Sequence, residues 1–225
     1  KNTNGGLINL PDNIMGKILK ELNNNINNKF IIIIPVYNAE KYIKKCLESI
    51  LIQDYKNYVL IIIDDCSTDE TFNIINDVRK KNDSEFKVIR NSERNGSALA
   101  NIIYGIELYS EDDEEIIVTV DGDDCLSDDK VLSYLNEIYQ DNDISITYGQ
   151  YEPLSKTYSN LCQPIPDTRT YRKSELWVTS HLRTFKRKVF NKIDNEDLKN
   201  KDGKYYNVSW DRAFMYPMIE MMGKK

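Results

Sequence analysis

The run Phe30-Ile31-Ile32-Ile33-Ile34, ended by Pro35, decides the fold class of this chain. A continuous stretch of β-branched and aromatic residues is typical of a strand that is buried on both faces. Strands of that kind lie in the middle of parallel sheets, where helices cover both sides. We therefore expect this run to be a central parallel strand.

Helical and strand patterns alternate on the C-terminal side of this run. Apolar residues recur at helical spacing from Ile43 to Leu51, and Val59-Leu60-Ile61-Ile62-Ile63 repeats the pattern of a buried strand. Further helices are expected near 69–81, 97–109 and 131–139, and further strands near 86–90, 116–120 and 144–148. Because parallel strands need crossover helices, this alternation predicts an α/β fold with a doubly wound, mostly parallel central sheet flanked by helices.

The regular alternation stops after Gly149. Residues 152–173 mix prolines with polar residues and are expected to form a long loop, which in a compact domain is often functional. Helical patterns resume around 175–189 and again around 211–222.

The length of 225 residues favours one main domain with a short extra segment. Residues 1–28 are Asn-rich and are expected to be either a short N-terminal helix or a linker. Residues 29–225 are expected to form the main domain, with a ligand-binding half over 29–150 and a second half over 151–225. The chain begins at Lys1, and we expect it to be excised from a longer protein with further domains.

Composition excludes several classes of function. A net charge of -6 lacks the positive footprint that non-specific nucleic-acid binding needs, so no nucleic-acid partner is expected. No apolar run approaches the roughly 18–20 residues of a transmembrane helix. The four cysteines form no CxxC pair and there is one histidine, which leaves no ligand set for structural zinc. Scattered thiols without a secretory signal favour a cytoplasmic location.

Three polar clusters follow expected strands. In an open α/β sheet, ligands bind beyond the carboxyl ends of the strands, so these clusters are candidates for a shared site. They are Pro35-Val36-Tyr37-Asn38, Asp64-Asp65-Cys66-Ser67-Thr68-Asp69 and Asp121-Gly122-Asp123-Asp124.

The third cluster carries the clearest chemical signal. Carboxylates two residues apart in a glycine-containing turn, Asp121 and Asp123, are able to converge on Mg²⁺ or Mn²⁺, which are commonly held by one or two carboxylates together with substrate phosphates. The competing interpretation is an acidic surface turn. In the second cluster Ser67 and Thr68 are equally well explained as helix caps, which leaves Asp64 and Asp65 at the strand tip without a structural reason.

Taken together, the clusters resemble the inverting family 2 glycosyltransferases, which have the GT-A nucleotide-sugar-binding fold. The three clusters, together with Arg94-Asn95-Gly96 and Asn101, stand in the family's order over residues 30–150. The resemblance implies that Pro35, Val36, Tyr37 and Asn38 line the nucleoside pocket and that Asp65 or Asp64 contacts uracil.

The resemblance also assigns the phosphate side of the site. It places Arg94, Asn95, Gly96 and Asn101 near the base and phosphates. In the Asp121-Gly122-Asp123 turn, it implies that Asp121 contacts the ribose or metal-bound water and that Asp123 ligates a Mn²⁺ or Mg²⁺ ion bridging the phosphates. A turn glycine at Gly96 and a helix cap at Asn38 are the structural alternatives.

The catalytic base and the acceptor side are assigned from the second half of the chain. The family places an acidic base at the start of a late helix, and Asp211 stands there, with a helix N-cap as the alternative. This sequence departs from the family's commoner Glu-Asp pair by having Trp210, which suits stacking on a sugar or packing. His181, Arg183 and Lys186 belong to a block found in a subset of the family and are candidates for contact with acceptor or phosphate.

The resemblance implies a metal-dependent inverting glycosyltransferase. Its donor would be a nucleotide-diphosphate sugar, with UDP as the expected nucleotide, and its acceptor a hydroxyl on a glycan or glycoprotein. One alternative is a nucleotidyltransferase that makes nucleotide sugars, but its Gly-rich signature is missing after the first strand, where Pro35-Val36-Tyr37-Asn38 stands. The other is a catalytically silent nucleotide-sugar-binding module.

Overall fold

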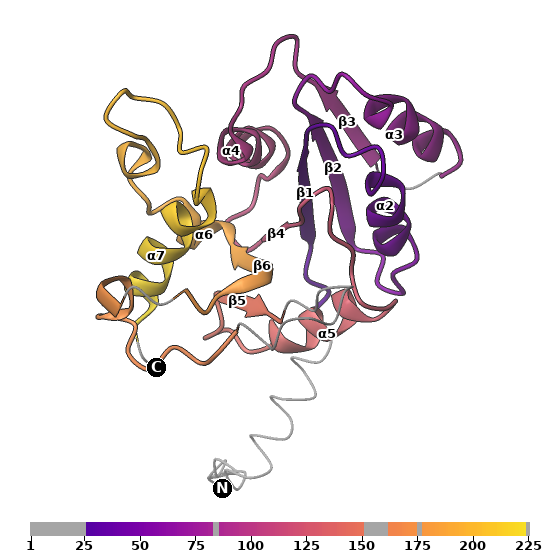
Figure 1. Ribbon diagram of the computed structural model, residues 1–225. Coiled ribbons are helices and arrows are strands. Elements are labelled where there is room, and N and C mark those ends of the chain that lie inside the picture. The colour runs from indigo at the N-terminus through magenta and orange to yellow at the C-terminus, as the bar shows by residue number, and fades with distance from the viewer. Residues whose placement is uncertain (1–25, 83–85, 151–161, 175–176, 224–225) are drawn as a thin grey trace, which may run out of the picture.

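The structure is a computed structural model that describes residues 26–82, 86–150, 162–174 and 177–223. The expectation of an N-terminal helix or linker therefore lies almost wholly outside the described residues, as does the first part of the expected loop over 152–173. Within the described ranges, one sheet is covered by helices on both faces (Figure 1).

Over the described residues, the sheet has six strands in the order β3-β2-β1-β4-β6-β5. The neighbouring pairs among β3, β2, β1 and β4 are parallel, and β6 runs antiparallel to both β4 and β5. The strands are β1 (Phe30–Val36), β2 (Tyr58–Asp64), β3 (Phe86–Arg90), β4 (Ile116–Thr119), β5 (Ile146–Gly149) and β6 (Ser180–Lys186). The expected mostly parallel sheet is confirmed, with β6 as its one reversed strand.

Alternating residues of β1 explain why the apolar run is continuous. Ile32 and Ile34 pack on one face of the sheet with helices α2, α3 and α5, whereas Ile31 and Ile33 pack on the other face with α4, α6 and α7. All four isoleucines are fully buried. The helices are α2 (Ile43–Leu51), α3 (Thr71–Lys80), α4 (Ala98–Tyr109), α5 (Val131–Ile138), α6 (Arg187–Phe190) and α7 (Trp210–Met222).

The expected helix around 175–189 is wrong. The structure places strand β6 over Ser180–Lys186 and only the short helix α6 after it. Apolar side chains of β6 lie on both faces of the sheet. Leu182 packs against the core on the side of α2, and Phe185 packs in the core on the side of α4. Pairing with β4 and β5 on both edges outweighs the helical spacing of the apolar residues.

Strand direction determines where the polar clusters meet. The parallel strands β1, β2 and β4 end at the same edge of the sheet, and the reversed strand β6 begins there. The register pairs Thr119 with Arg183, so the residues of β6 before Arg183 lie beside the chain that leaves β4. No helix within the described ranges is long and apolar enough to cross a lipid bilayer.

Candidate functional site

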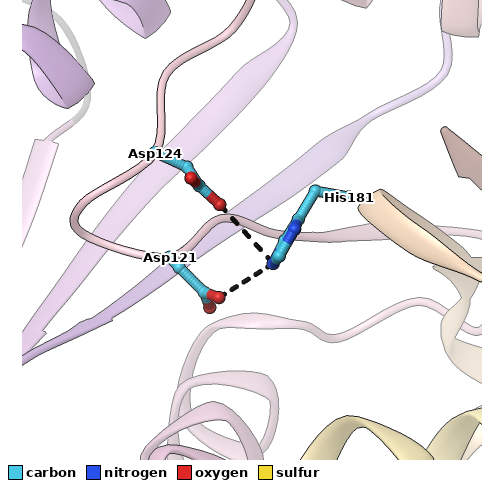
Figure 2. A group of neighbouring side chains, drawn as sticks. All are labelled: Asp121, Asp124 and His181. Carbon is cyan, nitrogen blue, oxygen red and sulfur yellow. Dashed lines mark hydrogen bonds and ion pairs between the residues drawn. The ribbon is translucent and has the colours of Figure 1, made fainter. Parts of the chain in front are cut away.

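The turn after β4 and the start of β6 bring two carboxylates and the histidine together. His181 Nε2 lies 2.8 Å from Asp121 Oδ2 and 3.5 Å from Asp124 Oδ2 (Figure 2). One ligand atom from each of these residues lies within 4.8 Å of the others. Carboxylate oxygens suit Mg²⁺ and Mn²⁺, and imidazole nitrogen is the commonest metal ligand, so this group fits a divalent cation.

The electrostatics of the turn also fit a cation. Burial raises the pKa of Asp124 above its ordinary value, His181 opposes the rise and the Asp121 carboxylate adds to it. Asp123 also contributes negative charge, although its side chain is exposed and outside the three-residue group. Several carboxylates in one turn repel one another, and a divalent cation would remove that repulsion.

Gly122 lets this turn pack directly on β1. A Cβ atom at Gly122 would lie 2.8 Å from Cγ2 of Val36, closer than real side chains approach. Glycine at this position therefore lets the turn lie directly against β1, and this contact positions the preceding residue, Asp121. Pro35 and Val36 are buried in β1, and Tyr37 and Asn38 are the exposed residues that follow them.

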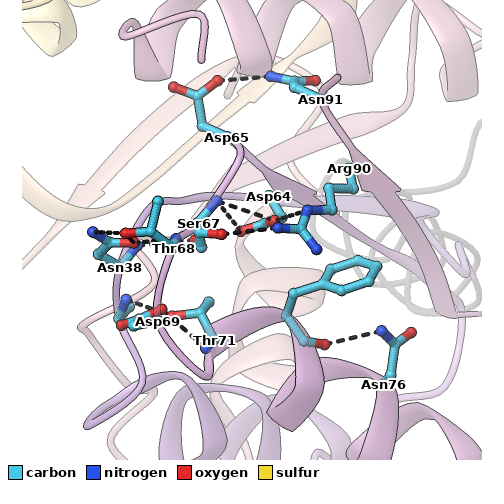
Figure 3. Close-up of polar contacts among 12 residues, drawn as sticks. Asn38, Asp64, Asp65, Ser67, Thr68, Asp69, Thr71, Asn76, Arg90 and Asn91 are labelled. Carbon is cyan, nitrogen blue, oxygen red and sulfur yellow. Dashed lines mark hydrogen bonds and ion pairs between the residues drawn. The ribbon is translucent and has the colours of Figure 1, made fainter. Parts of the chain in front are cut away.

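The two acids at the end of β2 have different surroundings (Figure 3). Asp64 is fully buried and forms an ion pair with Arg90, with 3.3 Å between Oδ2 and Nε. Asp65 Oδ1 accepts hydrogen bonds from Asn91 Nδ2 at 2.7 Å and from the Asn95 amide at 2.8 Å, and Oδ2 accepts one from the Gly96 amide at 2.8 Å. Asp64 is thus held inside the fold, and Asp65 organises the loop that follows β3.

Hydrogen bonding keeps Asp65 ionised. Burial alone would raise the pKa of Asp65, but the amides of Gly96 and Asn95 and the side chain of Asn91 hold it below its ordinary value. Asn101, buried in α4, accepts a second hydrogen bond from Asn91 at 3.0 Å. The loop containing Asn95 and Gly96 is therefore fixed from both β2 and α4.

An aromatic and a guanidinium group lie together on the exposed side of this loop. The Arg94 Cζ atom is 3.7 Å from the centre of the Tyr37 ring, so two planar groups stack between the segments after β1 and β3. Asn38 joins β1 to β2: its amide donates to Ser67 Oγ at 3.0 Å, and its side-chain oxygen accepts from the Thr68 amide at 2.8 Å (Figure 3). These contacts make one continuous polar surface at the sheet edge.

The start of α7 contributes the last candidate carboxylate. Asp211 lies in the first turn of α7, and its Oδ2 accepts a hydrogen bond from Arg183 Nη2 at 2.7 Å. Trp210 lies 5.7 Å from the same guanidinium and stacks on Phe214. The segment before α7 reaches the start of α4, because the Ser97 hydroxyl donates to the Tyr206 carbonyl at 2.8 Å.

The comparison with protein families is decisive at this point. The profile described as glycosyl transferase family 2 matches residues 31–198, which cover most of the chain and include the polar clusters after β1, β2 and β4. The chain belongs to glycosyl transferase family 2.

Relatives of this family 2 chain share part of their length with it. An uncharacterized glycosyltransferase of Haemophilus influenzae is 40% identical over 120 residues, which cover 53% of this chain and 46% of that relative. The chain thus spans about half of the length of this curated relative.

Solved structures confirm the GT-A fold. S. aureus TarS 1-349 in complex with UDP-GlcNAc has a TM-score of 0.64 at 18% identity, and the alignment covers 88% of this chain and 54% of the TarS 1-349 chain. The mannosyltransferase PcManGT of Pyrobaculum calidifontis, in complex with GDP-Man and Mn²⁺, has a TM-score of 0.56 at 19% identity and covers 74% of this chain and 47% of its own. At these identities the likeness shows the fold.

Most of the predicted site residues of this family 2 chain lie at one edge of the sheet, with three differences. Lys186 lies at the other end of β6, buried and paired with Glu114, so it does not join the site. His181 contacts the acidic turn, which its status as a lone histidine did not predict. Asp124, which the sequence analysis did not name as a ligand, lies beside His181, whereas the predicted ligand Asp123 is exposed and outside this group.

Proposed function

We propose that this chain is the donor-binding and catalytic part of a metal-dependent inverting glycosyltransferase. It would move a sugar from a UDP-linked donor to a hydroxyl group of a glycan or glycoprotein. One observation carries the proposal: the strand-tip group of Asp121, Asp124 and His181 lies on the same sheet edge as a stacked Tyr37–Arg94 pair, and β6 connects it to the Asp211 carboxylate.

The donor nucleoside is assigned to the segments after β1, β2 and β3. Tyr37 and Arg94 supply exposed planar groups against which a base stacks, and the loop with Asn95 and Gly96 presents backbone to the nucleotide. Asp65 fixes that loop and is the acid assigned to uracil. Asp64 is buried and paired with Arg90, so its role is structural.

The cation is assigned to the turn after β4. Asp121, Asp124 and His181 would hold Mn²⁺ or Mg²⁺, with the exposed Asp123 at the mouth of the same turn. Mn²⁺ in the complex of the Pyrobaculum mannosyltransferase supports this assignment. When bound, the cation supplies positive charge that stabilises the departing diphosphate.

The acceptor side is assigned to the start of α7. Asp211 would take the proton of the acceptor hydroxyl as that oxygen attacks the anomeric carbon and the bond from this carbon to the diphosphate breaks. Trp210 would provide a flat surface for a sugar ring next to the catalytic base Asp211. Donor orientation and charge stabilisation would supply most of the acceleration.

The test is a donor screen with purified protein. UDP-GlcNAc, UDP-glucose and GDP-mannose are each incubated with the protein in Mn²⁺ and, separately, in EDTA, and nucleoside diphosphate release is measured with and without glycan acceptors. We expect metal-dependent release from a UDP-sugar and little release from the Asp211→Asn variant. Binding of UDP without turnover of any donor would favour the silent module, and release of pyrophosphate from sugar phosphate and UTP would favour the nucleotidyltransferase.

A further inference from the structure

Arg183 has an unusual environment for a charged side chain. It is 3% exposed, and its Nη2 donates to Asp211 Oδ2 at 2.7 Å. Its Nε and Nη1 atoms are buried and have no hydrogen-bond partner among the residues that the structure describes. A guanidinium carries five N–H donors in a rigid plane, so a large part of this cation is left without an acceptor.

Buried donors without an acceptor are rare in native proteins, because burying a polar group without a hydrogen bond is costly. One carboxylate partner does not satisfy a buried arginine, and the ring of Trp210 at 5.7 Å covers the guanidinium without offering oxygen atoms. The donors without an acceptor therefore indicate an oxygen-rich ligand beside Arg183, close to the start of α7.

The position of Arg183 indicates which part of a nucleotide-sugar donor would bind to these N–H groups. Two residues before Arg183 on β6, His181 contacts the carboxylates that would hold the cation and its phosphates. Arg183 itself acts electrostatically on Asp124, and its Nη2 donates a hydrogen bond to Asp211. In an inverting transfer the catalytic base and the leaving phosphate lie on opposite sides of the anomeric carbon. A side chain that reaches both, as Arg183 would, lies beside the transferred sugar.

We propose that Arg183 binds oxygen atoms of the transferred sugar through Nε and Nη1 while Nη2 holds the Asp211 carboxylate in position. This inference rests on the proposed function and adds a role in positioning: one guanidinium couples occupation of the sugar site to the geometry of the base. The planar guanidinium forms charge-assisted hydrogen bonds in fixed directions, so it orients both the sugar and the Asp211 carboxylate. The ammonium group of lysine does not impose such directions.

The first test measures donor binding in the full chain with Mn²⁺ present. UDP, UDP-GlcNAc and UDP-glucose are titrated calorimetrically into wild type, Arg183→Lys and Arg183→Gln, and thermal unfolding identifies variants that do not fold. We expect UDP affinity to stay within about twofold of wild type, because UDP lacks the sugar. The affinity for the UDP-sugar that wild type binds should fall by roughly tenfold in each variant, because hydrogen bonds to the charged group are lost.

The second test is a double-mutant cycle on turnover. Release of UDP from the same UDP-sugar, with water as acceptor, is measured for Arg183→Lys, Asp211→Asn and the double variant. We expect kcat of Arg183→Lys to fall by about 10- to 100-fold, the order of loss that follows misplacement of a catalytic group. In the Asp211→Asn background the same change should have no further effect on kcat, since the base that Arg183 positions is already absent.

Arg172 provides the matched control. It forms a two-point ion pair with Glu220, with Nε–Oε1 at 2.9 Å and Nη2–Oε2 at 2.8 Å, on the exposed side of α7. Arg172→Lys should leave both donor affinity and kcat unchanged.

The outcomes separate the two proposals. Wild-type protein that neither binds nor turns over any nucleotide sugar overturns the proposed function. An active wild type with an Arg183→Lys variant equal to it overturns the role of Arg183 alone. Equal losses of affinity for UDP and UDP-sugar would show that the vacant donors bind the diphosphate, and additive effects on kcat would show that Arg183 does not act through Asp211.

Discussion

The Nε2 atom of His181 lies 2.8 Å from Oδ2 of Asp121, although sixty positions separate the two residues in sequence. The contact exists because β6 runs antiparallel to β4 and begins at the edge where β4 ends. A strand that runs in the opposite direction thus places an imidazole nitrogen beside carboxylates at the end of a parallel strand. The first predictions concern this contact.

Replacing His181 should weaken Mn²⁺ binding while leaving the sheet intact. His181→Ala removes the imidazole from the candidate metal-binding group that includes Asp121 and Asp124. We expect the dissociation constant for Mn²⁺, measured by electron paramagnetic resonance in the presence of UDP, to rise by at least about tenfold. The thermal midpoint without metal should change little, because the His181 side chain is only partly buried. Unchanged Mn²⁺ affinity would place the cation away from β6.

Two neighbouring carboxylates offer a matched pair for the second ligand. The spacing of the sequence assigns it to Asp123, whereas the structure places Asp124 next to His181 and leaves Asp123 exposed. We expect Asp124→Asn to weaken Mn²⁺ affinity more than Asp123→Asn, and Asp121→Asn to weaken it most. The same resonance titration measures all three variants. A larger loss of Mn²⁺ affinity in Asp123→Asn than in Asp124→Asn would show that Asp123 is the ligand.

The stability contributed by Asp65 should disappear in acid. Since hydrogen bonds hold the pKa of Asp65 below its ordinary value of 3.8, this carboxylate stabilises the folded state above that pH, and the contribution is lost as pH falls through the lower pKa of the folded state. Asp65→Asn should therefore cost about 1–3 kcal/mol of unfolding free energy at pH 7. The difference from wild type should shrink below about pH 4.

Denaturant unfolding at several pH values measures this effect. The control is Asp77→Asn, which removes an exposed carboxylate that lies 3.5 Å from Lys80. Exposed ion pairs contribute little, so this variant should be near neutral at every pH. A constant loss for Asp65→Asn down to the most acidic pH at which the protein folds would show that its charge is not what stabilises the loop.

The sequence predicted the parallel part of the fold and the edge where the site lies. Apolar runs such as Phe30–Val36 indicate burial on both faces, and parallel strands end at a common edge, so the placement of Asp64, Asp65 and Asp121 at that edge followed from pattern alone. Strand β6 could not be found in this way, because its pattern also fits a helix and its partners β4 and β5 lie far away in sequence.

The same limit explains why the sequence did not indicate the contact between His181 and the acidic turn. A lone histidine has no spacing that marks it as a ligand, so His181 becomes visible only once β6 is known to pair with β4. Spacing in a turn does not fix which carboxylate points inward, and the choice between Asp123 and Asp124 depends on how the chain bends after Gly122. Lys186 was grouped with His181 because both belong to the block that resembles a subset of the family, but Lys186 lies at the opposite end of β6.

The contact of Gly122 with β1 leads to a prediction about how packing controls the metal turn. In Gly122→Ala the new methyl group would lie 2.8 Å from Cγ2 of Val36, so either the turn or β1 must move. Overpacking of this kind typically costs about 1–3 kcal/mol of stability. Since Asp121 directly precedes Gly122, the displacement should also weaken Mn²⁺ affinity, measured by the same resonance titration, without removing any ligand.

A second substitution distinguishes this packing effect from a change in backbone freedom. Val36→Ala removes Cγ2, the nearest atom that the new Cβ would meet, and keeps the Val36 Cβ at 3.0 Å, so the Gly122→Ala/Val36→Ala protein should recover part of the Mn²⁺ affinity that Gly122→Ala loses. Val36→Ala alone creates space in the core and should lower stability while affecting Mn²⁺ affinity less. If the double variant binds Mn²⁺ no better than Gly122→Ala, contact between β1 and the turn does not set the position of Asp121, and the conformation of Gly122 itself must do so.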